Sequence, residues 1–251
     1  MKQHVIIVGG GASGLFSAIH IDKEKFNVTI IDGNEKLGKK LLVTGNGRCN
    51  LSNTSDLSDK YNVDDKTFIN DIFDVFSNKE IKKEFNNIGL FIKEKNNGLY
   101  PSSMQASSVV DALVSYCRLC NVSIVSNTIV TNFSKNDTGE FELCTKNTLD
   151  DKTNTMKCHK LIISSGTKAG VKDDYSQYLY SSIKKSNHHI IDFNPALCSL
   201  YVDKKLFLNK NFFKNATGVR TEICAKIQID NVFSNNYFGE LQLTDYGISG
   251  I

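Results

Sequence analysis

The sequence predicts an α/β fold that begins with a strand, a helix and a second strand. The first apolar run, Val5–Val8, meets a glycine-rich segment, and a helix-compatible stretch from Leu15 to Ile21 follows directly. A second apolar run, Val28–Ile31, ends at Asp32. This order of strand, glycine turn, helix, strand and acidic residue is typical of the first βαβ unit of dinucleotide-binding proteins.

The glycine turn has the pattern Gly9-x-Gly11-x-x-Gly14. Gly9 permits a sharp turn out of the strand, Gly11 lets the main chain approach a pyrophosphate, and Gly14 lets the helix pack closely on the strand. The helix N-terminus then offers free N–H groups to phosphate oxygens. Asp32 stands where a carboxylate accepts hydrogen bonds from the ribose of an adenine nucleotide. We therefore expect a dinucleotide site; the alternative is a glycine turn without a ligand.

Composition excludes several other classes of protein. The chain has 251 residues, and 30 Lys and Arg against 27 Asp and Glu give a net charge of +3, which indicates neither a nucleic-acid surface nor a polybasic membrane anchor. No apolar run has the length of a membrane span, and the N-terminal strand does not resemble a signal peptide. The seven cysteines are then expected to be reduced thiols in a cytoplasmic protein.

Two further patterns allow a metal or redox site, but a structural role is favoured for both. Cys117 and Cys120 have CxxC spacing at the end of a helical stretch, and no second CxxC follows. His188 and His189 have no acidic residue or cysteine at ligand spacing, so no metal is predicted.

The middle of the chain predicts further elements in order. Helical spacing of apolar residues predicts one helix over Phe68–Phe85 and another after Pro101, capped by Ser107 or Ser108. The remaining runs predict strands: Leu90–Ile92, Leu99–Tyr100, Val122–Val125, Thr128–Phe133, Phe141–Thr145, Met156–Lys157 and Leu161–Ile163. From Pro195 the pattern changes to alternating strands, at Leu197–Val202, Arg220–Ile229 and Gly239–Leu243.

Three more blocks turn this general pattern into a resemblance to a family. They are Lys36–Asn50 with its core Gly45-Asn46-Gly47-Arg48-Cys49-Asn50, the segment Tyr100–Leu113, and Gly239–Gly250. Together with the N-terminal glycines they resemble the HI0933-like flavoproteins, which include the BaiN-type NAD(P)/FAD-dependent oxidoreductases. The resemblance implies an FAD-binding, three-layer Rossmann-like domain interrupted by a β-rich insert. The implied divisions are 1–194 for the FAD domain, 195–242 for part of the insert, and 243–251 for the start of the return.

The resemblance also implies a cofactor site, residue by residue. Gly9, Gly11, Ala12, Ser13 and Gly14 would hold the FAD pyrophosphate, and Asp32 the adenosine ribose. Lys40 and the loop from Thr44 to Asn50 would lie along the diphosphate and the flavin ring. Val130 would meet adenine through its main chain, and Ser165 and Gly166 would also touch the cofactor.

The chain departs from the family in two ways. The family usually has Ala-Thr-Gly-Gly after the third strand and a glycine-rich loop further on, whereas this chain has Ser164-Ser165-Gly166-Thr167 and then Asp173-Asp174-Tyr175. Family members are also longer and close the FAD site with a later glycine-rich segment. The chain is therefore expected to be an N-terminal portion that alone binds FAD weakly and aggregates.

The implied activity is hydride transfer from NAD(P)H through FAD to an unsaturated or electrophilic small molecule. A nicotinamide-only dehydrogenase and a non-catalytic nucleotide-binding module acting through a partner are the alternatives. No acid–base residue is evident. Arg48 could bind a phosphate, stabilise reduced flavin or hold an anionic substrate, while Cys49 is better explained as a packing residue. Tyr100 could donate a proton, although an aromatic residue before proline more often packs a turn, and Tyr246 could line the substrate pocket.

Overall fold

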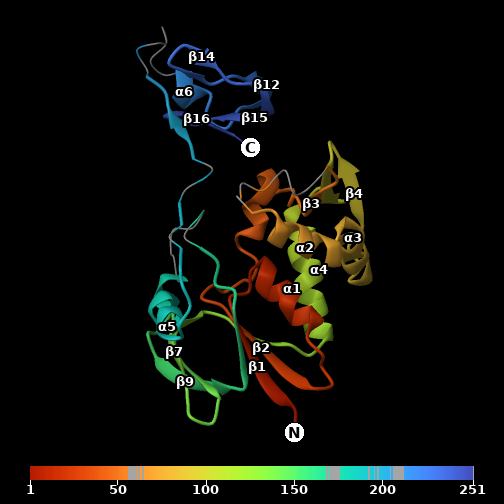
Figure 1. Ribbon diagram of the computed structural model, residues 1–251, viewed down its shortest axis with the longest axis vertical. Helices are drawn as coiled ribbons and strands as arrows, with labels where there is room; N and C mark the ends of the chain where they lie inside the picture. Colours follow the sequence, from red (N-terminus) through yellow and green to blue (C-terminus); the bar gives the residue numbers. More distant parts are fainter. Residues whose placement is uncertain are drawn as a thin grey trace. The chain divides into compact units, whose positions relative to one another are not determined.

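The computed structural model divides the chain into two compact units, residues 1–191 and 192–251 (Figure 1). The structure describes residues 1–55, 61, 63, 65–167, 169, 176–191, 193–194, 196, 198–203, 205 and 212–250. The Asp173-Asp174-Tyr175 segment and Pro195 lie outside the described residues.

The centre of the first unit is a parallel sheet with the strand order β10-β1-β2-β6. Its strands are β1 (Gln3–Val8), β2 (Phe26–Ile31), β6 (Ser123–Val125) and β10 (Lys160–Ile163). Each neighbouring pair is parallel. The α/β fold and the strands predicted at its centre are therefore confirmed.

Strand β1 supplies both cores of the first unit because successive side chains point to opposite faces of a sheet. Val5 and Ile7 pack with the helices α1 (Ala12–His20) and α4 (Ala106–Leu119). Ile6 and Val8 belong to a second buried cluster on the other face. A strand that is covered on both faces is apolar throughout, which explains the uninterrupted run of valine and isoleucine.

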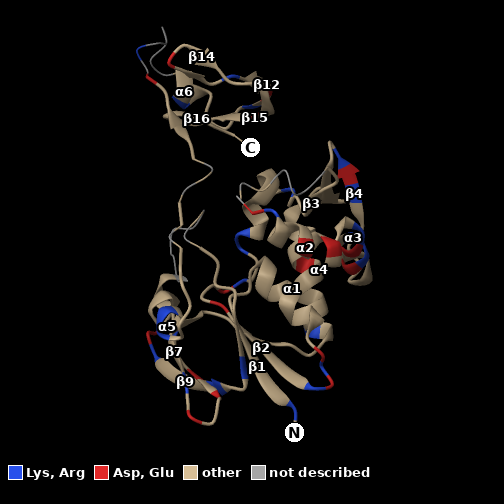
Figure 2. Cartoon of the chain, viewed as in Figure 1, with Lys and Arg blue, Asp and Glu red and all other residues tan. Residues whose placement is uncertain are grey.

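An antiparallel meander covers that other face. It consists of β7 (Thr128–Lys135), β8 (Phe141–Asn147) and β9 (Thr153–Cys158), with η3 (Ser176–Leu179) and α5 (Tyr180–Lys185) against it. Helices, parallel sheet and meander form the three layers visible in Figure 1. Both signs of charge occur on the meander (Figure 2), with ion pairs Lys146–Asp151, Lys152–Asp150 and Lys157–Glu142.

The helix predicted over Phe68–Phe85 is wrong as a single element. The structure has two helices, α2 (Thr67–Val75) and α3 (Asn78–Asn87). Ser77 begins α3 with a capping box, in which its side chain accepts a main-chain N–H while Glu80 accepts the N–H of Ser77. In an uninterrupted helix these main-chain N–H groups would donate to carbonyls of the preceding turn. Here the side chains of the capping box accept them instead, which marks the start of a new helix.

A small sheet flanks these helices, with the order β3-β5-β4. Its strands are β3 (Ser52–Asn53), β4 (Ile92–Lys95) and β5 (Gly98–Pro101), and the segment before β3 contains the short helix η1 (Leu41–Gly47). Helix α4 begins after Gln105, so Ser107 and Ser108 lie inside it and the predicted cap is wrong. No helix among the described residues is both long and apolar enough to span a membrane.

The second unit is antiparallel, with the sheet order β11-β16-β15-β12. It comprises β11 (Leu200–Tyr201), α6 (Phe212–Asn215), β12 (Arg220–Ala225), β13 (Gln228–Ile229), β14 (Val232–Phe233), β15 (Tyr237–Leu243) and β16 (Gly247–Gly250). The single strand predicted over Arg220–Ile229 is thus two strands. Strands β15 and β16 form a hydrogen-bonded hairpin within this sheet, on both sides of the boundary expected at 242, which stays a prediction.

Candidate dinucleotide site

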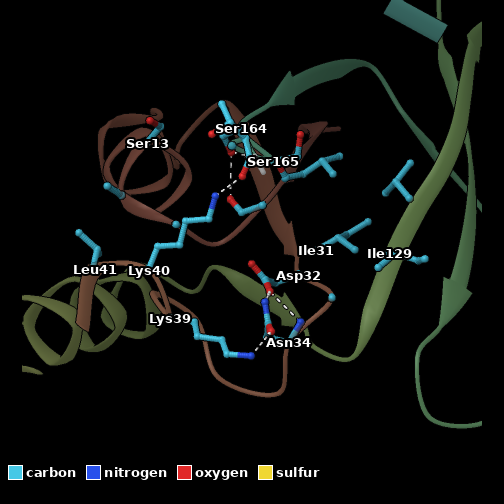
Figure 3. A pocket seen from close by; sticks show the side chains of 18 of the residues that line it. Ser13, Ile31, Asp32, Asn34, Lys39, Lys40, Leu41, Ile129, Ser164 and Ser165 are labelled. Carbon is cyan, nitrogen blue, oxygen red and sulfur yellow. Dashed lines mark hydrogen bonds between the residues drawn. The ribbon is translucent and has the colours of Figure 1, made fainter. Parts of the chain in front are cut away.

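A pocket of about 450 Å³ opens at the carboxyl ends of β1, β2 and β10 (Figure 3). Ligands of open α/β sheets bind at this edge, since the loops that leave the strands meet there. Ten residues predicted from the sequence line the pocket together: Gly9, Gly11, Ala12, Ser13, Asp32, Lys40, Thr44, Val130, Ser165 and Gly166. Seven predicted residues are outside its lining: Gly14, Gly45, Asn46, Gly47, Arg48, Cys49 and Asn50.

The three glycines of the turn have different surroundings. A Cβ atom on Gly9, whose φ is +104°, would lie 2.4 Å from the carbonyl oxygen of Ser164. A Cβ atom on Gly14 would lie 1.9 Å from the carbonyl oxygen of Gly9. Gly11 has no atom within 4 Å of the equivalent position, so its missing side chain leaves open space in the pocket. Gly9 thus permits the turn after β1 and Gly14 permits the close approach of α1 to that turn, whereas Gly11 leaves room for a ligand.

The Asp32 carboxylate, directly after β2, is hydrogen-bonded to the glycine turn. Its Oδ2 accepts the main-chain N–H of Gly10 at 2.7 Å, and its Oδ1 accepts the N–H and the side-chain amide of Asn34 at 2.8 and 3.0 Å. A carboxylate accepts about four hydrogen bonds, so about one position remains for a ribose hydroxyl. A second hydroxyl would have to replace the side-chain amide of Asn34.

Positive charge lines the opposite side of the pocket. The Lys40 ammonium donates to the carbonyl of Thr167, and Figure 3 shows its side chain extending toward Ser164 and Ser165. The first turn of α1 contains no acidic residue, and Ala12 and Ser13 are exposed there. The partial positive charge of the helix N-terminus and the Lys40 ammonium both favour a bound diphosphate.

The Gly45–Asn50 loop is tightly turned and lies outside the pocket lining, and Cys49 is its one buried residue. Gly45, Asn46 and Gly47 all have positive φ, from +53° to +78°, and so does Cys49 at +57°. Cys49 is 2% exposed and belongs to the core with α1 and α4. The packing role predicted for Cys49 is confirmed. Contacts between this loop and a cofactor remain a prediction.

The cysteines differ enough in burial to give a chemical test. Burial raises the pKa of the Cys49 thiol, and burial together with the neighbouring Cys120 raises that of Cys117 to about 11. A raised pKa means less thiolate, the reactive form, at pH 8.5. We expect iodoacetamide at that pH to label exposed Cys144 and Cys224 well before Cys49 and Cys117, as read by peptide mass spectrometry. Equal labelling of Cys49 and Cys144 would contradict its placement in the core.

Twelve of the residues that line the pocket were not predicted from the sequence, among them Asn34, Lys39, Ser164 and Leu179. Asn34 accepts a hydrogen bond from Lys39 at 3.3 Å while donating to Asp32. Ser164 follows β10 and faces the glycine turn. The strand-to-glycine junction at residues 164–166 was the available signal, since a third parallel strand ends at the same edge as the first two.

The fold and the pocket define the class of protein, a Rossmann-type dinucleotide-binding protein. The family described as HI0933-like protein Rossmann domain matches residues 3–242. The chain belongs to this family.

Two curated relatives and one solved structure are similar to the chain. The 3-dehydro-bile acid delta(4,6)-reductase of Clostridium scindens is 31% identical over 247 residues, 98% of this chain and 57% of the relative. The ribosomal RNA dihydrouridine synthase of Escherichia coli is 30% identical over 161 residues, 64% of this chain and 38% of the relative. The crystal structure of Thermovibrio ammonificans THI4 shares the fold, with 13% identity, a TM-score of 0.50, and coverage of 73% and 62% of the two chains. The chain thus matches only 57% and 38% of the lengths of these two curated relatives.

Proposed function

We propose that the chain forms the FAD-binding part of an oxidoreductase. The observation that carries this proposal is the open space at Gly11, directly at the N-terminus of α1. A diphosphate needs such a place, because there the main chain can approach its oxygens and donate N–H groups to them. The residues present therefore fit FAD.

In this proposal different pocket residues bind different parts of the cofactor. The main-chain N–H groups of Ala12 and Ser13 bind the diphosphate, with Lys40 neutralising its charge. Asp32 binds the adenosine ribose, and Val130, 3% exposed on β7, contacts the adenine. The chemistry that bound FAD supplies is hydride transfer from NAD(P)H to an unsaturated or electrophilic substrate, which also takes up a proton.

The names of the relatives support reduction of a carbon–carbon double bond. One is a delta(4,6)-reductase, and a dihydrouridine synthase saturates a double bond of uracil. A small molecule is favoured over RNA as substrate, because the reductase matches 98% of the chain and the synthase 64%. The net charge of +3 and the paired charges of the meander also offer little attraction to nucleic acid.

The test is to mix the purified chain with FAD, remove free cofactor and record the visible spectrum. Retained flavin absorbance that is bleached anaerobically by NADH or NADPH is the expected result. An unsaturated ketone should then restore the absorbance faster than uridine in RNA does. A chain that neither retains FAD nor binds it in a fluorescence titration would contradict the proposal, and one that binds FAD without being bleached by NADH or NADPH would favour a non-catalytic nucleotide-binding module.

Asp32→Ala is expected to weaken FAD binding at least about tenfold. The variant loses the charge-assisted bond to a ribose hydroxyl, which contributes roughly 1.5–3 kcal/mol, and also the acceptor for the N–H of Gly10. Titration followed by flavin fluorescence measures the effect. Asp32→Asn keeps an acceptor oxygen but loses the charge, so its affinity should be intermediate. An unchanged dissociation constant for Asp32→Ala would place the carboxylate outside the cofactor site.

A further inference from the structure

The peptide group between Gly9 and Gly10 is held at both ends. Its N–H, from Gly10, donates to Asp32 Oδ2 at 2.7 Å. Its carbonyl, from Gly9, accepts from the Ser164 hydroxyl at 2.9 Å. Asp32 follows β2 and Ser164 follows β10, so the two groups reach the turn from the strands on either side of β1.

Ser164 is itself fixed in place. Its main-chain N–H donates to the carbonyl of Val8 at 2.8 Å, and its Oγ also lies 3.0 Å from that oxygen. The Oγ would be 2.7 Å from a Cβ atom on Gly14. The hydroxyl therefore lies between the end of β1, the glycine turn and the first turn of α1.

A glycine turn needs such restraint because glycine peptides rotate at low cost. Gly9 has a φ of +104°, and Gly10 and Gly11 follow it, so three consecutive residues lack a side chain that could limit rotation. The N–H groups that face the pocket follow directly in the chain. Holding the Gly9–Gly10 peptide in one orientation lowers the entropy lost when a diphosphate binds.

We propose that Ser164 is a positioning residue for diphosphate binding, acting through the carbonyl of Gly9. This inference rests on the proposed FAD function, and it adds a residue from the third strand to the site. Ser164 has no direct contact with the ligand in this role. Its loss should therefore weaken ligands that carry a diphosphate and leave ligands without one unaffected.

The test compares FAD, ADP and adenosine as probes with the 251-residue chain and its Ser164→Ala variant. We expect Ser164→Ala to weaken FAD and ADP about threefold to tenfold, the range for one neutral hydrogen bond, and to leave the adenosine affinity unchanged. Ser164→Thr keeps the hydroxyl and should restore most of the ADP affinity. Calorimetry or NMR titration gives the affinities, and thermal unfolding confirms that each variant is folded.

Ser186→Ala is the matched control. It removes a serine hydroxyl bond of 3.0 Å to the carbonyl of Ser182, at the end of α5 and outside the pocket lining. It should leave all three affinities at the wild-type value. Equal loss of ADP and adenosine in Ser164→Ala, or no loss of either, would overturn the positioning role while leaving the FAD proposal intact. A wild-type chain that binds none of the three probes would overturn both.

Discussion

Replacing Gly11 with valine is expected to abolish FAD binding while the chain remains folded. No atom lies within 4 Å of a Cβ at this position, so the valine side chain meets only the space assigned to the diphosphate. The main chain tolerates it, because Gly11 has φ −82° and ψ −164°, an extended conformation open to any residue. We expect affinity to fall by at least about a hundredfold, as for an overpacked site.

Flavin fluorescence titration measures the loss of affinity, and far-ultraviolet circular dichroism with thermal unfolding checks the fold. Gly11 is the N-cap of α1, where valine is less favourable than glycine, so a stability loss of up to about 1 kcal/mol is expected. Wild-type FAD affinity in Gly11→Val would mean that no diphosphate lies at this turn.

Gly14→Ala, unlike Gly11→Val, is expected to destabilise the fold itself. Alanine normally stabilises a helix by about 0.5–1 kcal/mol relative to glycine. Here the added Cβ would lie 1.9 Å from the Gly9 carbonyl oxygen, a main-chain atom held by Ser164. Either α1 or the end of β1 must move, and we expect a loss of about 3 kcal/mol or more in the free energy of unfolding.

Urea unfolding of Gly14→Ala beside Gly11→Ala provides the comparison, since the same change is made three residues apart on one turn. Gly11→Ala should unfold close to the wild-type midpoint. A Gly14→Ala variant as stable as wild type would show that α1 does not pack against β1 as closely as described.

The parallel sheet was predictable because its strands are apolar on both faces. The runs that became β1, β2 and β10 contain few polar residues, and they are followed by Gly9, Asp32 and Ser164 respectively. The errors arose where apolar spacing continued across a break. Ser77 and Glu80 start α3 with a capping box, a local pattern that the apolar spacing of α2 and α3 obscured.

Spacing alone predicted the site only where its residues follow one another in the chain, whereas Val130, Ser165 and Gly166 were predicted from the family resemblance. The glycine turn and Asp32 have a recognisable spacing because one βαβ unit positions them. Ser164 reaches the same turn through the pairing of β10 with β1, in which Val5 lies opposite Lys160. No spacing pattern records a pairing between such distant segments. The same limit applies to Leu179, which enters the pocket from η3.

The position of β1 between β2 and β10 also determines the order in which the chain can fold during synthesis. Strand β2 follows β1 within about one helix, but the residue opposite Val5 on the other side is Lys160. A ribosome adding about 5–20 residues per second needs roughly 10–30 s to make the chain between them. Throughout that interval the nascent β1 has an open edge and apolar side chains that can associate with other chains. Strand β1 is thus synthesised first but acquires its second neighbouring strand late, and chaperones that bind nascent chains have the longest access to it.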